Sequence, residues 1–315
     1  MEEEEESQNQ SGVELIDLDE RGNPSQRKII TGHILTNNTN YYIYIVVLTI
    51  ILYIFRNLLV FNNSKIYYKF KNIEDINRNI SESIINLINK KPNARIGIVY
   101  GEPLIGVYNY LINKYEKGEI SFKDVQFFSF NGICGSKKNS NSSYYHFLTE
   151  DFLSKIDIQE KNLFLMDEDG YALYEFKSKA DIYNYMLEIN PLDLQIILFD
   201  ENGNIGFIDQ NTNFDLDSHI VKLKPPFRES IKNLYGNLEK TPRYGITQGI
   251  KNILETNEII AVGLGEDKAK IVRILTKGVF IQKYPITVLC KHRGTVKVYT
   301  DEKAGSLVEE YYKNF

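Results

Sequence analysis

The chain has no tryptophan, and its 315 residues include only two cysteines, Cys134 and Cys290. Two cysteines cannot build a disulfide-rich scaffold, and they argue against a cysteine-based zinc site. The formal net charge is −5, so the composition gives no reason to expect nucleic-acid binding. We therefore expect no metal, no cofactor and no nucleic-acid partner.

The bulk composition is that of a globular protein. Hydrophobic residues make up 43% of the chain and charged residues 25%. The length allows one large α/β domain or two smaller ones.

Residues 1–40 are polar and acidic, beginning with the run Glu2–Glu6. Few large apolar residues interrupt this segment, so it cannot bury enough surface to offset the entropy lost on folding. We predict a disordered acidic tail.

Residues 41–61, YYIYIVVLTIILYIFRNLLVF, have a different character. The segment has close to the ~20 residues needed to cross a bilayer, and tyrosines cluster at its first end, as interfacial aromatics do. Arg56 lies near the far end, where its side chain can reach the interface. The segment therefore predicts a transmembrane helix, and the soluble alternative is a buried pair of strands.

Basic residues near this segment favour its C-terminal side: Arg56, Lys65, Lys69 and Lys71, against Arg27 and Lys28. By the positive-inside tendency, a single-pass protein of this kind has its large C-terminal domain in the cytoplasm.

From residue 62 onward the pattern alternates between strand and helix. The expected strands are 66–70, 95–100, 124–130, 194–199, 258–264 and 286–290. The expected helices are 73–88, 106–115, 144–156, 181–189, 241–254 and 268–276. Such alternation predicts βαβ units, and hence a doubly wound, mostly parallel Rossmann-like sheet with helices on both faces.

Ligands in doubly wound sheets bind beyond the carboxyl ends of the strands. The loops expected to matter are therefore 101–105, 131–143, 200–213 and 263–268.

Four segments, read together, resemble the glucosamine-6-phosphate deaminase (isomerase) family. They are KPNARIGIVYGEPLIGVYNYLI, YEKGEISFKDVQFFSFN, SSYYHFLTEDFLSKIDIQEKNLFLMD and TPRYGITQGIKNILETNEIIAVGLGEDKA. The resemblance covers nearly the whole region after residue 64. It implies a Rossmann-like deaminase domain over residues 62–315 and an association into oligomers.

The resemblance also implies where catalytic residues should stand. The family's Asp base, in Phe-Asn-Met-Asp-Glu-Tyr, falls on Asn131, and the next Glu on Gly132. The ring-opening Asp and His, in Pro-Asp-Gly-His, fall on Asn202 and Asn204, and the supporting Glu falls on Asp209. Amides do not titrate near neutral pH, so Asp209 is the one ionisable catalytic position that keeps a carboxylate.

The phosphate-binding positions are altered as well. Where the family has Gly-Ser-Thr-Pro, this chain has Gly101-Glu102-Pro103-Leu104, which adds a negative charge and removes an N–H donor. Arg228 and Lys268 match the family's phosphate-binding cations, and either could instead pair with Glu102. Thr247 and Gly249 also match, on an expected helix near the site.

The leading hypothesis is a membrane-anchored pseudoenzyme that binds a hexosamine phosphate or another anion weakly, or regulates a deaminase-like partner. One alternative is an active deaminase with relocated acids, which would convert glucosamine 6-phosphate to fructose 6-phosphate and ammonia. A structural scaffold is the other.

Overall fold

The computed structural model describes residues 14–18, 24–29, 42–51, 65–136, 140, 143–166 and 173–309. Two compact units divide the chain, Met1–Leu59 and Val60–Phe315. Each is considered by itself.

The first unit contains two short strands, β1 (Glu14–Leu18) and β2 (Pro24–Ile29), which pair antiparallel. The predicted disordered tail over residues 1–40 differs from the structure at these strands. A hairpin gains main-chain hydrogen bonds without needing a buried core, which composition alone does not reveal. The remainder of residues 1–40 lies outside the described residues.

Residues 42–51 form a helix with exposed side chains. Within the described part of the chain, every helix is too short or too polar to cross a membrane. Residues 52–61 of the predicted transmembrane helix lie outside the described residues, so the span stays a prediction.

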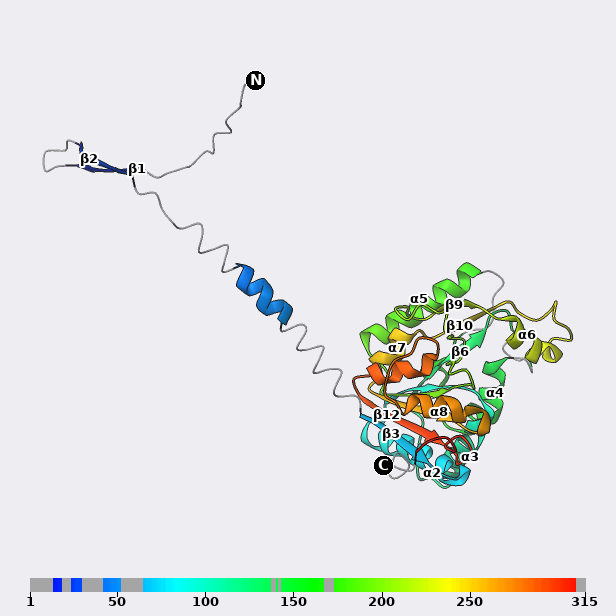
Figure 1. Cartoon of the computed structure of the whole chain (residues 1–315). Helices are drawn as coiled ribbons and strands as arrows, with labels where there is room; N and C mark the ends of the chain where they lie inside the picture. The colour runs from blue at the N-terminus through cyan, green and yellow to red at the C-terminus, as the bar shows by residue number, and fades with distance from the viewer. Residues whose placement is uncertain are drawn as a thin grey trace, which may run out of the picture. The chain divides into compact units, whose positions relative to one another are not determined.

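A seven-stranded sheet forms the centre of the second unit (Figure 1). Its order is β3 (Lys65–Phe70), β12 (Thr295–Thr300), β11 (Glu258–Gly263), β8 (Leu194–Leu198), β4 (Arg95–Ile98), β5 (Gln126–Ser129) and β7 (Leu163–Phe164). All six pairings are parallel. The predicted doubly wound α/β fold is therefore confirmed for this unit.

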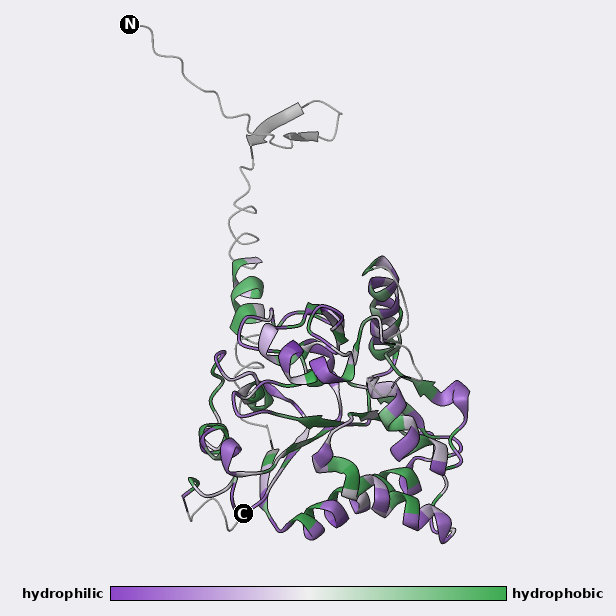
Figure 2. Ribbon diagram, turned by 90° about the vertical axis from the view of Figure 1, so that its right-hand side faces the viewer, coloured by the Kyte–Doolittle hydropathy of each residue, from purple (hydrophilic) through white to green (hydrophobic). Residues whose placement is uncertain are grey.

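Helices lie on both faces of the sheet (Figure 1). They are α2 (Ile73–Lys90), α3 (Ile105–Glu116), α4 (Tyr144–Asp151), α5 (Leu173–Ile189), α6 (Pro225–Ile231), α7 (Ile250–Glu255) and α8 (Ala269–Leu275). Because both faces are covered, the central strands are rich in apolar residues, and green segments cross the middle of the domain in Figure 2.

Helix α2 shows why the sequence folds as it does locally. The Asn72 side chain caps the helix by accepting a hydrogen bond from the main-chain N–H of Asp75 at 2.8 Å. Ile76, Ile80 and Ile84, spaced one turn apart, are all buried on the face toward the core.

A second, antiparallel sheet has the order β6 (Asn131–Ile133), β10 (Tyr244–Thr247) and β9 (His219–Lys222). The prediction of a helix over residues 241–254 is wrong in its first half, because residues 244–247 are a strand and the helix begins at Ile250. The predicted strand at 286–290 is also wrong, since Pro285–Lys291 is a 3-10 helix.

Candidate functional site

The predicted site loops lie together at one edge of the central sheet. Strands β4, β5, β8 and β11 end at Ile98, Ser129, Leu198 and Gly263, and the four loops follow them. Since these strands are parallel, their carboxyl ends share one edge. The placement of the loops is confirmed for their described residues.

Asn131 begins β6 and is only 8% exposed. Its main chain pairs with Thr247 of β10. A Cβ added at Gly206 would lie 3.5 Å from Nδ2 of Asn131, so this amide lies against the loop that carries Asn202 and Asn204. The fold therefore brings Asn131 against Gly206, in the same loop as Asn202 and Asn204.

Asp200 organises that loop. Its Oδ1 accepts hydrogen bonds from the main-chain N–H groups of Asn202 at 2.9 Å and Asn204 at 2.8 Å. Its Oδ2 accepts a third from Nδ2 of Asn204 at 2.7 Å. Both carboxylate oxygens are therefore engaged by the loop itself, and the Asn204 amide is oriented by an acid. The Asp-x-Asn-x-Asn spacing is the sequence signal for this turn.

Asp209 forms an ion pair with Lys224, and its side chain is 17% exposed. Its Oδ1 also accepts a hydrogen bond from the main-chain N–H of Asn211 at 2.8 Å. The retained carboxylate is thus paired with a cation that sequence reasoning missed. Lys224 comes directly before two prolines that start α6, and nothing in that pattern indicates an ion pair.

A cleft of about 610 Å³ opens over these residues. Its lining residues are Asp200, Glu201, Asn202, Asn204, Asp209, Gln210, Lys224, Pro226, Phe227, Ser230, Lys283 and Tyr284. A smaller hollow of about 130 Å³ shares Asp200, Asn204 and Asp209 with it. Carboxylates, amides and two ammonium groups line the cleft, and no imidazole is among these lining residues.

The predicted phosphate-binding cations have other partners. Arg228 donates from Nε to the carbonyl of Pro242 at 3.0 Å, and from Nη2 to the carbonyls of Leu238 and Thr241 at 2.7 and 2.9 Å. Lys268 pairs with Asp267 at 2.5 Å. Arg228 therefore fastens the loop that leads into β10.

Glu102 does not close a triad with Arg228 and Lys268. Its side chain is exposed and has no ion pair within the described part of the chain. At Gly101 an added Cβ would lie 2.3 Å from the Leu198 side chain, which keeps this position small. Anion binding by Gly101, Arg228 and Lys268 stays a prediction.

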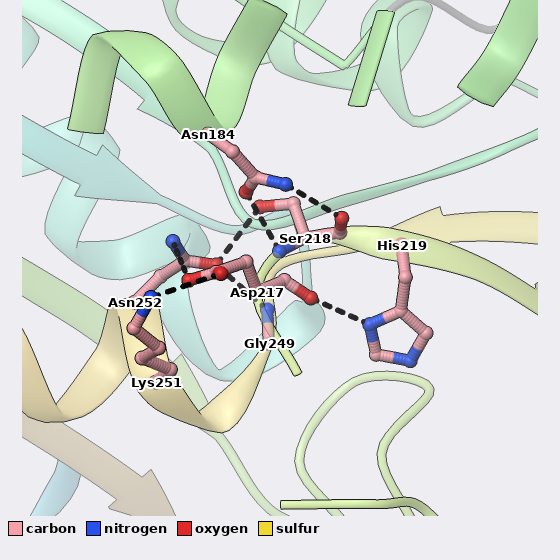
Figure 3. A network of polar contacts seen from close by, with 7 residues as sticks. All are labelled: Asn184, Asp217, Ser218, His219, Gly249, Lys251 and Asn252. Atoms are coloured by element: carbon pink, nitrogen blue, oxygen red, sulfur yellow. Dashed lines mark hydrogen bonds and ion pairs between the residues drawn. The ribbon is translucent and has the colours of Figure 1, made fainter. Parts of the chain in front are cut away.

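A polar network joins the second sheet to helices α5 and α7 (Figure 3). Asn184 and Ser218 exchange two hydrogen bonds, Ser218 N to Asn184 Oδ1 at 2.7 Å and Asn184 Nδ2 to Ser218 O at 2.9 Å. Asn252 Oδ1 accepts from Ser218 Oγ at 3.0 Å and from the N–H of Gly249 at 3.1 Å. The network holds β9 and β10 in place, and β10 in turn holds Asn131.

Two of the three histidines in the described residues have a ring nitrogen within hydrogen-bond distance of a main-chain carbonyl. His219 Nδ1 lies 2.7 Å from the Asp217 carbonyl (Figure 3). His292 is fully buried, with Nε2 2.6 Å from the Thr256 carbonyl. Among the residues that the structure describes, no group of three or more His, Cys, Asp or Glu is placed to hold a metal ion.

Comparison with proteins of known sequence shows the family to which the chain belongs. No family model matches the chain. The chain is 30% identical over 240 residues to a glucosamine-6-phosphate deaminase of Mycoplasma mycoides subsp. mycoides, covering 75% of this chain and 94% of that protein. The chain belongs to the glucosamine-6-phosphate deaminase family.

Another relative of the chain supports the same family. A glucosamine-6-phosphate deaminase of Thermoanaerobacter sp. is 29% identical over 240 residues, covering 76% of this chain and 93% of that protein.

Solved structures show the same fold. A monomeric glucosamine-6-phosphate deaminase superposes with a TM-score of 0.70 at 24% identity, over 77% of this chain and 99% of its own. The 6-phosphogluconolactonase of Trypanosoma brucei superposes at 0.63 with 13% identity, over 78% and 99%.

Proposed function

We propose that this chain is a non-catalytic member of the deaminase family that binds a hexosamine phosphate or a similar anion weakly, or regulates a deaminase-like partner. The observation that carries the proposal is the set of amides Asn131, Asn202 and Asn204 at the positions of the family's proton carriers. Asn131 begins β6, and it lies against the loop after β8 that carries Asn202 and Asn204.

The family's reaction opens a sugar ring and moves a proton from C2, so it needs groups that gain and lose protons. Removing a single general base commonly costs ~10²–10⁴ in rate, and this chain lacks the base and both ring-opening groups. Asp209 forms an ion pair with Lys224, and both carboxylate oxygens of Asp200 accept hydrogen bonds from Asn202 and Asn204 in the same loop. These contacts favour loss of catalysis over relocated acids.

The cleft keeps groups that suit a sugar phosphate. Amides can hydrogen-bond to sugar hydroxyls, and the ammonium groups of Lys224 and Lys283 can attract a phosphate. Three carboxylates in the same lining oppose an anion, which is why the binding we propose is weak.

A membrane tether belongs to the same proposal. It is supported by the apolar run at residues 41–61 and by the excess of basic residues after it. Flotation of the full chain with lipid vesicles, lost when residues 41–61 are deleted, is the expected result. Equal flotation of both proteins would contradict the tether.

Thermal unfolding of the full chain with glucosamine 6-phosphate tests the binding function. We expect an upward shift of the midpoint that saturates with ligand and shrinks in Lys283→Ala. Lys117→Ala, an exposed cation at the end of α3, serves as the matched control. A midpoint that no hexose phosphate changes would favour the scaffold alternative.

The active-enzyme alternative has one observation in its favour, which is that Asp200, Glu201 and Asp209 line a single cleft. Release of ammonia and fructose 6-phosphate that disappears in Asp209→Asn would establish it.

A further inference from the structure

Helix α5 has two faces of opposite role. Its inner face buries Phe176, Ala180, Tyr183 and Leu187 in a cluster with Phe128. Its outer face carries Tyr174, Ser178, Ile182, Tyr185 and Ile189, each three or four residues after the one before. At ~3.6 residues per turn these five side chains form one stripe, here called the α5 stripe.

The α5 stripe is exposed and mostly apolar. Tyr174 is 74% exposed, Ile182 60%, Tyr185 64% and Ile189 66%. The outward face of a helix at the margin of a domain is ordinarily polar, and a contiguous row of large apolar groups marks an interaction site. Helix α5 lies at the outside of the domain (Figure 1).

The apolar surface extends beyond the helix. Ile182 and Met186 also line a hollow of about 240 Å³. The hollow continues over the edge strand β7 and residues Leu165 and Met166. A partner on the α5 stripe would therefore also cover β7, the last strand of the central sheet among the described residues, and edge strands favour association.

We propose that the α5 stripe binds the same stripe of a second copy of this chain, with the two helices antiparallel about a twofold axis between Asp181 and Ile182. This arrangement places Tyr174 opposite the partner's Ile189, and Ser178 opposite the partner's Tyr185. The smallest member of the stripe thus faces a large aromatic ring, and the isoleucines at position 182 meet at the axis. An isologous interface uses the same surface on both subunits, so the stripe must be complementary to a copy of itself running in the opposite direction.

Three exposed charged residues, Lys177, Asp181 and Glu188, lie along one flank of the stripe. Lys177 and Glu188 are both exposed and lie on the same side of the stripe, toward opposite ends of α5. In the antiparallel pair each Lys177 approaches the partner's Glu188, and the two Asp181 carboxylates approach each other near the axis. In a parallel pair the equivalent flanks lie on opposite sides of the interface, so Lys177 would not meet the partner's Glu188 there.

Sedimentation equilibrium of the full chain tests the surface. The unaltered chain is expected to form dimers, and Ile182→Glu is expected to weaken them by about tenfold or more because it buries carboxylates at the axis. Ile73→Glu, at a 54% exposed position of α2, is the matched control and should leave the dimer intact. Circular dichroism of both variants checks that they fold.

A charge exchange tests the identity of the partner and the orientation. Lys177→Glu should weaken the dimer, and the double variant Lys177→Glu, Glu188→Lys should restore it, because only an antiparallel pair of identical helices joins these two positions. An unaltered chain that stays monomeric would overturn the proposal, and would fit coverage of the stripe by residues 41–61 of the same chain or by a different protein. A dimer insensitive to Ile182→Glu, or a double variant no better than Lys177→Glu, would overturn it equally.

Discussion

At the scale of single residues, the site is defined by one acid that holds a loop and three amides that cannot exchange protons. Asp200 accepts three hydrogen bonds from Asn202 and Asn204. A carboxylate used in this way is a structural element, because its oxygens are already satisfied by the loop. Under the proposed function, the cleft binds by hydrogen bonding and charge attraction.

Asp200→Ala should destabilise the protein, since it leaves two main-chain N–H groups and one amide without their acceptor. We expect the free energy of unfolding to fall by about 2 kcal/mol. Glu201→Ala, which removes one exposed contact to Asn202 at 3.3 Å, should change it by less than about 0.5 kcal/mol. Urea unfolding of both variants measures the difference, and equal losses would contradict the role given to Asp200.

At the scale of elements, the central strands could be predicted because both of their faces are buried. β8 is apolar except for the buried Gln195, β11 is apolar after Glu258, and β4 is short and fully buried. The site loops followed from these strands, since the carboxyl ends of parallel strands share an edge. The sequence and the family resemblance together therefore predicted that Asn131, Asn202 and Asn204 lie at this edge of the sheet.

The contacts of the second sheet were not accessible from the sequence. β9 is only partly buried, and the Ile246 strand was hidden inside a run that also suits a helix. Residues 286–290 formed a short apolar run, which periodicity cannot assign, and Pro285 at the start marks the helix instead. The Asp209–Lys224 pair joins a loop to α6 and depends on tertiary packing.

Gly249 shows how closely elements approach around α7. Its φ of −92° is open to any residue, but an added Cβ would lie 2.0 Å from the Leu216 carbonyl oxygen. Gly249→Ala is therefore expected to lower the free energy of unfolding by about 2–3 kcal/mol.

Gly118→Ala gives the comparison for Gly249→Ala, because Gly118 has φ of 71° and open space around it. Its cost should be about 1 kcal/mol, from backbone conformation alone. Denaturant unfolding ranks the two variants, and a smaller loss for Gly249→Ala would refute the close approach.

At the scale of the whole molecule, the chain keeps the fold of a solved deaminase, and we propose that it has lost the proton carriers. The superposition on a solved deaminase covers 99% of that chain, so nearly the whole of its fold has a counterpart here. The stability of the fold depends mainly on burial of its apolar core. The buried side chain of His292 makes that stability depend on pH.

Burial lowers the pKa of His292 below its ordinary value of 6.5. The unfolded chain then takes up a proton near pH 6.5 that the folded chain does not, so stability is retained above that pH and falls below it. The extra slope should approach ~1.4 kcal/mol per pH unit and be absent in His292→Gln. Urea unfolding at pH 7.5, 6.5 and 5.5 measures it; parallel profiles for the two proteins would contradict the assignment.

Ammonia release is the most direct measurement of whether catalysis has been lost. The full chain is incubated with glucosamine 6-phosphate, and ammonia and fructose 6-phosphate are assayed over time beside a protein-free blank. The account predicts that the unaltered chain matches the blank. Ammonia formation above the blank that Asp209→Asn abolishes would contradict it.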